Sequence, residues 1–180
     1  MVMMIAAFIW GFSEATFFFI IPDVLLSYYA LRNNDLKKIF LINIICITGA
    51  ALGGAAVFIM SSIDHSFVIE FMLAIPAIHT YMLRHVESEM AAGTFSALVT
   101  GPLFGVPYKL FAAFAPLHTN IFIFILFSIP ARFTRFIIVS LVAYLLSHKI
   151  FNGLSVKVKT LIWLFVWMIV YVIYFSIHHF

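Results

Sequence analysis

Long runs of apolar residues, separated by short polar clusters, dominate the chain from end to end. Three of these runs, 39–60, 121–146 and 161–177, are close to the ~20 residues that an α-helix needs to cross a bilayer. Pro130 interrupts the second run, and a tryptophan pair with Tyr171 and Tyr174 marks the third, as interfacial anchors would. The pattern predicts an all-α integral membrane protein with three spanning helices.

The first apolar stretch, residues 4–31, does not fit a plain span. A straight helix of that length would be ~42 Å long, whereas the hydrocarbon core of a bilayer is ~30 Å thick. Glu14, Pro22 and Asp23 lie inside it. Pro22 lacks an amide hydrogen and disfavours the helical conformation at Ile21, so we expect the helix to break there. The two halves are too short to span, which predicts a re-entrant hairpin that enters and leaves on one face.

A second stretch with the same character covers residues 91–116. Gly101, Gly105 and Pro107 lie in its middle, and Lys109 follows two residues after Pro107. Gly and Pro at these positions predict a second break and a second re-entrant hairpin.

Between the first span and the second hairpin the chain is harder to assign. We expect a turn at 61–66, and an interfacial or half-buried segment at 67–83, for which a true span is the competing interpretation. A polar loop is expected at 84–89 and a basic loop at 148–159. The chain is then one membrane domain, divided into 1–60 (hairpin and span), 61–90, 91–148 (hairpin and span) and 160–177.

Loop charges and an internal pattern predict an inverted repeat. Lysine and arginine concentrate in the loops 32–38 and 148–159, which the positive-inside rule assigns to the inside, whereas the region between them is poor in both. A shift of 85 residues (107 − 22) places Pro22 on Pro107 and the span 39–60 on 124–145. A hairpin and a span, repeated with opposite orientation, is an architecture of membrane transporters. Two ordinary kinked helix pairs are the alternative.

Small residues within the run 39–60 predict close helix packing. Gly49, Ala50, Gly53 and Gly54 form a face with GxxxG spacing. Cys46 is the single cysteine, which excludes an internal disulfide and any multi-cysteine metal site. We therefore expect Cys46 to be a small apolar residue of the span.

Composition narrows the function. The chain is 65% hydrophobic and only 9% charged, against about 25% charged residues in soluble domains. The formal net charge is +3, without a basic run that could follow a phosphate backbone, so we expect no nucleic-acid partner. No HExxH or GxSxG motif is present, and the histidines are scattered, so we expect neither an enzyme, nor a metal site, nor a cofactor.

Five charged residues fall inside the apolar stretches. They are Glu14, Asp23, Lys109, Arg132 and Arg135. Each alone would cost ~2.5–3.5 kcal/mol at the bilayer centre, so ion pairs between segments are expected. We expect Asp23 to lie close to Lys109, with the other three around them, although Arg135 could instead extend to the interface as an anchor. The alternative to a functional site is a salt-bridge network that only fixes helix order.

These residues resemble motifs of the DedA family, also called the VTT or SNARE-associated Golgi protein family. Glu14 followed by Pro22-Asp23 and the pair Leu25-Leu26 is similar to its first hairpin motif; Gly101, Pro107 and Lys109, with Pro130 and Arg132 further on, are similar to its second. Two departures are that Pro22 joins Asp23 without a glycine, and that Lys109 stands where the family has arginine. The resemblance implies a multi-pass protein of the bacterial inner membrane, with two inverted re-entrant hairpins, that translocates or scrambles a lipid such as undecaprenyl phosphate.

The sequence thus predicts a lipid translocase for an anionic phospholipid or polyprenyl phosphate. Lys109, Arg132 and Arg135 would bind the phosphate, and Glu14 and Asp23 would hold these cations in the empty site and carry a proton. A proton-coupled carrier of a small ion and a structural assembly protein are the alternatives, and a homo-oligomer is left open.

Overall fold

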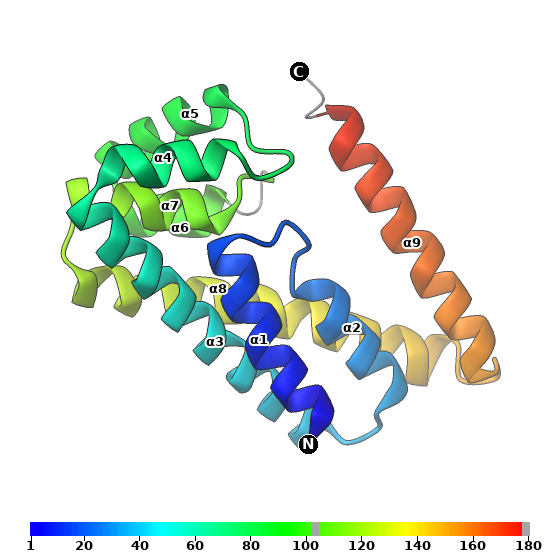
Figure 1. Ribbon diagram of the computed structural model, residues 1–180. Coiled ribbons are helices and arrows are strands. Elements are labelled where there is room, and N and C mark those ends of the chain that lie inside the picture. The colour runs from blue at the N-terminus through cyan, green and yellow to red at the C-terminus, as the bar shows by residue number, and fades with distance from the viewer. Residues whose placement is uncertain (102–104, 178–180) are drawn as a thin grey trace.

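The structure is a computed structural model that describes residues 1–101 and 105–177. Within these residues every regular element is helical, as predicted (Figure 1). In chain order the elements are α1 (Val2–Thr16), α2 (Asp23–Arg32), α3 (Leu36–Ile63), α4 (His65–Leu73), α5 (Thr80–Ala92), α6 (Thr94–Thr100), α7 (Tyr108–Phe114), the 3-10 turn η2 (Ala115–Leu117), α8 (Ile121–Leu145), the π-helical turn η3 (Leu146–Ile150) and α9 (Val156–Ile177).

Three helices are long and apolar enough to cross a membrane: α3, α8 with its extension η3, and α9. They coincide with the three predicted spans, and each is longer than predicted because the helix continues into its polar flanks. The helix α8 also runs through Pro130 without ending, and the Thr134 hydroxyl donates a hydrogen bond to the Pro130 carbonyl at 2.8 Å. The expected basic loop 148–159 shortens to residues 151–155.

The first apolar stretch is broken at Pro22 as predicted, and the break extends back from the proline over residues 17–22. Helix α1 ends at Thr16, where the amides of Phe17 and Phe18 both donate to the Ser13 carbonyl. Helix α2 begins at Asp23, with Pro22 as its N-cap. The Trp10 indole donates to the Ile20 carbonyl at 3.0 Å, which holds the connecting residues 17–22 against α1.

The second stretch is also broken as predicted. Gly101 ends α6, and Pro107 is the N-cap of α7. Gly105 has a φ of 83°, in the left-handed region that favours glycine. A side chain at Gly101 would overlap the Phe111 ring, so only glycine permits this approach.

The segment between α3 and α6 corrects the sequence interpretation. The expected polar loop 84–89 is wrong: it lies in α5, whose residues Met82, Val86 and Met90 are buried on one face while polar residues lie on the other. A span over 67–83 is also contradicted, because α4 ends at Leu73 and an irregular connection through Pro76 follows. The expected turn 61–66 reduces to Asp64, which caps α4.

Glycines allow α1 and α3 to pack in direct backbone contact. A side chain at Gly49 or Gly53 would overlap the α1 carbonyls of Phe8 and Phe12, and one at Gly11 would overlap the Cys46 carbonyl. The predicted small face of α3 is therefore confirmed as a helix-packing surface. Gly54 extends it differently, since it makes room for the Tyr108 hydroxyl of α7.

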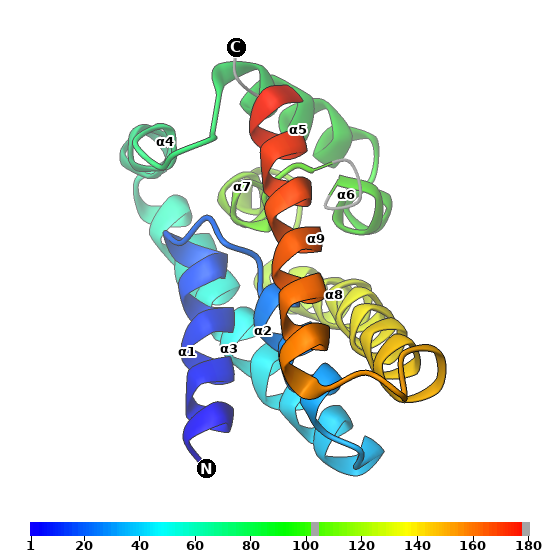
Figure 2. The same cartoon turned by 90° about the vertical axis from the view of Figure 1, so that its right-hand side faces the viewer.

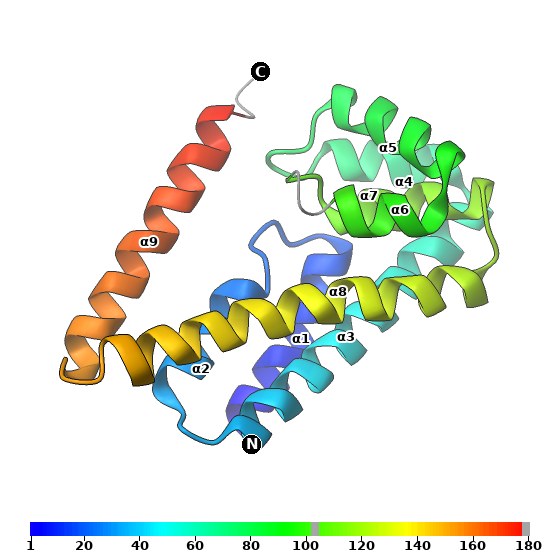
Figure 3. The same ribbon diagram turned by 180° about the vertical axis from the view of Figure 1, so that it is seen from behind.

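The helices form two halves that share α3 and α8. Helices α1 and α2 lie in one half and α4 to α7 in the other. Two connections face the centre, residues 17–22 before α2 and residues 105–107 before α7 (Figures 1 and 3). The buried apolar side chains follow the same division into two clusters. Helix α9 stands beside both halves, and Figure 2 shows it crossing in front of them.

Candidate functional site

The five charged residues singled out in the sequence gather at the centre of the fold. Glu14, Asp23, Lys109 and Arg132 are buried, whereas the side chain of Arg135 keeps 24% of its surface exposed. Four different helices supply them: α1, α2, α7 and α8. The expectation that they would pair across segments is confirmed by two ion pairs.

The inner ion pair joins Arg132 to Glu14. The Arg132 Nη2 donates to a carboxylate oxygen of Glu14, and the guanidinium stacks 4.0 Å from the centroid of the Tyr108 ring, with Phe136 on another side. Tyr108 is itself fixed by its hydroxyl, which donates to Ser128 at 3.1 Å. The Nε of Arg132 is buried and has no partner among the described residues, so one donor of this guanidinium is unused.

The outer ion pair joins Arg135 to Asp23 with two hydrogen bonds. The Nη2 and Nε of Arg135 lie 2.6 and 3.3 Å from the two carboxylate oxygens, the bidentate geometry of a strong pair. Asp23 is the first residue of α2, where the helix dipole also favours a negative charge. Arg135 is therefore no interfacial anchor, but shares the inward face of α8 with Arg132.

Lys109 has a different partner from the one expected. Its Nζ donates to the Phe18 carbonyl at 2.7 Å, whereas Asp23 pairs with Arg135. The expected Asp23–Lys109 contact is wrong because Asp23 opens α2, which packs along α8 and presents the carboxylate to α8. Lys109, near the start of α7, still joins the second break to the first, because its hydrogen bond ends on Phe18 in the connection 17–22.

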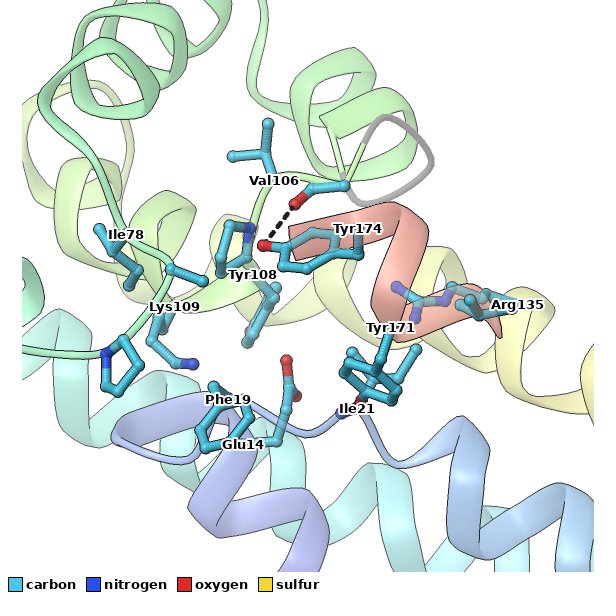
Figure 4. A pocket seen from close by; sticks show the side chains of 15 residues that line it. Glu14, Phe19, Ile21, Ile78, Val106, Tyr108, Lys109, Arg135, Tyr171 and Tyr174 are labelled. Atoms are coloured by element: carbon cyan, nitrogen blue, oxygen red, sulfur yellow. Dashed lines mark hydrogen bonds between the residues drawn. The ribbon is translucent and has the colours of Figure 1, made fainter. Parts of the chain in front are cut away.

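A cavity of about 210 Å³ lies between these groups. Glu14, Lys109 and Arg135 line it together with residues from both connections, and Figure 4 shows Glu14 and Lys109 directed into the same space. Helix α9 closes one side. The Tyr171 hydroxyl accepts from the Ile21 amide at 3.1 Å, and the Tyr174 hydroxyl donates to the Gly105 carbonyl at 3.4 Å.

A larger groove of about 620 Å³ runs along the other side of the arginines, between α6 and α8. Phe95, Leu98 and Val99 of α6 form one wall, and α8 supplies Arg132 and Arg135 to the other. Arg135 thus lines both the polar cavity and the groove.

Sequence reasoning missed the aromatic part of this site. Tyr108 was not singled out, although in the sequence it lies between Pro107 of the second break and the charged residue Lys109. Tyr171 and Tyr174 were interpreted as interfacial anchors, yet they contact the two connections. Their spacing of three residues places them on one face of α9, but nothing in the sequence tells which face turns inward.

Within residues 1–101 and 105–177, no three His, Cys, Asp or Glu side chains gather as metal ligands. The site can instead hold an anion: three cations stand against two carboxylates, which leaves an excess of one positive charge at a buried position. In comparisons with family models, curated proteins and solved structures, the chain matched none.

Proposed function

We propose that the protein moves an anionic lipid across the membrane. The observation that carries the proposal is the position of Arg135, which lines both the polar cavity and the apolar groove. A lipid needs the two environments at once, because its phosphate seeks a cation and its tails seek apolar surface. A carrier for a small soluble ion would need the cavity alone.

The charge balance supports a phosphate as the headgroup. Lys109, Arg132 and Arg135 exceed Glu14 and Asp23 by one positive charge, and the cavity holds a cation, Lys109, whose hydrogen-bond partner is a neutral carbonyl. A phosphate monoester or diester would neutralise this excess. Arg135 would bind it through its fork geometry, and Lys109 as a point charge.

In this proposal α1–α2 and α6–α7 are two re-entrant hairpins of opposite orientation, each followed by a span. Support comes from the central position of both connections, from the Lys109–Phe18 hydrogen bond between them, and from the resemblance of the motifs around Glu14, Pro22, Gly101, Pro107 and Arg132 to the DedA family. Membership of that family, a bacterial inner-membrane location and undecaprenyl phosphate as substrate belong to the same proposal.

Glu14 is the residue that would couple transport to protons. Glu14 lines the cavity together with Lys109 and Arg135. A phosphate bound there would bring negative charge close to the buried Glu14 carboxylate, which favours the neutral acid. Proton uptake would then accompany lipid binding.

Reconstitution in vesicles tests the function. Purified protein is placed in vesicles that carry a trace of a labelled phosphatidylglycerol or polyprenyl phosphate, and the fraction of label accessible from outside is followed over time. With the wild type we expect the labelled lipid to redistribute between the two leaflets, and with Arg135→Gln we expect this redistribution to be slow. Lys157→Gln, an equal charge change at an exposed site, is the matched control.

Two results would refute the proposal: no lipid movement by folded protein, or movement of a soluble ion without lipid.

The orientation in the membrane is tested separately. In a Cys46→Ala background, cysteines placed at Asn34 and at Asn152 should be labelled from the inside, and one at Glu87 from the outside. Labelling of the two basic loops from opposite faces contradicts the inverted hairpins.

A further inference from the structure

A second hollow lies away from the charged site, between α2, the end of α8 and the first half of α9. Its volume is about 270 Å³. Its walls are almost wholly apolar, and Val142, Ile162 and Val166 on them are exposed. In a membrane such surface is in contact with acyl chains. Figure 1 shows α9 beside α2 and the end of α8, the elements that form the walls of this hollow.

A buried cation stands at one end of this hollow. Lys159 keeps 9% of its surface exposed, and its Nζ donates to the Ser147 carbonyl at 2.7 Å. An ammonium has three donors, and this carbonyl uses one of them. Among the described residues no carboxylate lies within 4.0 Å of it, unlike Arg132 and Arg135. A buried charge without a counter-ion is costly, and an anion at this position would remove that cost.

The wall that carries the cation is tied to α2 by hydrogen bonds. The indoles of Trp163 and Trp167 donate to the Ser27 hydroxyl at 2.9 and 3.1 Å, and that hydroxyl donates to the Asp23 carbonyl at 2.6 Å. Lys159, Trp163, Trp167 and Val170 follow one another along one face of α9, a length of about 16 Å at 1.5 Å per residue. This apolar strip is long enough to lie along an acyl chain, with the cation of Lys159 at the end where a headgroup would lie.

We propose that this hollow is a binding site for one resident anionic phospholipid, with its phosphate on Lys159 and an acyl chain against Trp163 and Trp167. The inference does not depend on the proposed transport. Because Lys149, Lys157 and Lys159 surround the loop 151–155, the positive-inside rule places this end at the cytoplasmic leaflet, whose anionic lipids attract basic segments. The lipid would fill the gap between α9 and α2.

The three tryptophans of the chain allow a direct test. In a Trp10→Phe background, Trp163 and Trp167 are the only indole fluorophores, and both line the hollow. The protein is placed in nanodiscs of phosphatidylcholine with increasing fractions of phosphatidylglycerol that carries brominated acyl chains. We expect half-maximal quenching at a roughly tenfold lower fraction than with brominated phosphatidylcholine, the ratio expected for one charge-assisted hydrogen bond.

Lys159→Gln is the deciding variant, since a glutamine can still donate to the Ser147 carbonyl but carries no charge. The tryptophan fluorescence of this variant should be quenched equally by brominated phosphatidylglycerol and brominated phosphatidylcholine. Lys159→Arg and the exposed neighbour Lys157→Gln should keep the preference for phosphatidylglycerol, and so should Arg135→Gln, which separates this result from a failure of transport.

Equal quenching by both lipids in the parent protein would overturn the site. A loss of preference in Lys157→Gln as large as that in Lys159→Gln would also overturn it, since general surface charge would then explain the effect. Quenching that disappears in a dimer fraction would show a second copy of the chain as the occupant, and would equally contradict the proposal.

Discussion

The two ion pairs of the site differ although they start from the same face of α8. Arg132 pairs with Glu14 of α1 in a position where both side chains are buried and an aromatic ring covers the guanidinium. Arg135 pairs with Asp23 of α2 one turn further on, and faces both the cavity and the groove. The difference teaches that pairs formed by neighbouring residues of one helix can differ in accessibility: both side chains of the inner pair are buried, whereas Arg135 of the outer pair is partly exposed and borders both the cavity and the groove.

Breaking the inner pair should have the largest effect. Arg132→Met leaves the Glu14 carboxylate buried without its partner, and we expect a loss of about 3–5 kcal/mol in the free energy of unfolding in detergent. The double variant Glu14→Gln/Arg132→Met removes both charges and should recover most of that loss. A double variant as unstable as the single one would contradict the assignment of an ion pair buried in the interior.

Breaking the outer pair should instead affect transport. Arg135→Gln removes the partly exposed cation, and we expect lipid movement in vesicles to fall at least about tenfold, which corresponds to one charge-assisted hydrogen bond. The thermal stability of Arg135→Gln in detergent should fall less than that of Arg132→Met, because the Arg135 side chain is less buried. If stability falls as far as in Arg132→Met, the two pairs do not differ in the way proposed.

The pH dependence of transport separates the two carboxylates. Glu14→Gln mimics the protonated acid, so lipid movement should become flat across roughly pH 5 to 8, while the wild type and Asp23→Asn keep their dependence. In the wild type we expect the rate of lipid movement to differ by about a few-fold between the two ends of this pH range. Identical profiles for the wild type and Glu14→Gln would exclude Glu14 as the coupling group.

The smallest effect is expected on the side of the cavity that α9 closes. Tyr171→Phe removes the acceptor of the Ile21 amide, a neutral hydrogen bond worth about 1 kcal/mol. The unfolding free energy should fall by that amount, and limited proteolysis of the loop 151–155 should become faster. Val172→Ala, on an exposed face of α9, is the control and should change neither.

The sequence predicted the charged site because burying charge in lipid is costly whatever the fold. Glu14, Asp23, Lys109, Arg132 and Arg135 could be identified on that basis alone, and the prolines and glycines of the breaks followed from backbone chemistry. Which cation meets which carboxylate could not be predicted, since it depends on how α2 packs along α8.

Other failures have equally local causes. The polar residues of α5 resembled a loop because the buried residues Met82, Val86 and Met90 lie four apart and alternate with charges. The tyrosines of α9 could be anchors or site residues, because a helix that is apolar all round does not reveal its inner face. Tertiary packing decides both cases.

The glycine contact between α1 and α3 has a mechanical consequence. Gly11, Gly49 and Gly53 lie against the carbonyls of the facing helix, so a rotation or shift of α1 that brought a residue with a side chain to one of these positions would cause a collision with the backbone. Glu14 is therefore anchored to the frame of the molecule, one turn from Gly11. Any motion that separated Asp23 from Arg135 would therefore have to break the hydrogen bonds that tie residues 17–22 to Trp10, Lys109 and Tyr171, with Glu14 as the fixed point.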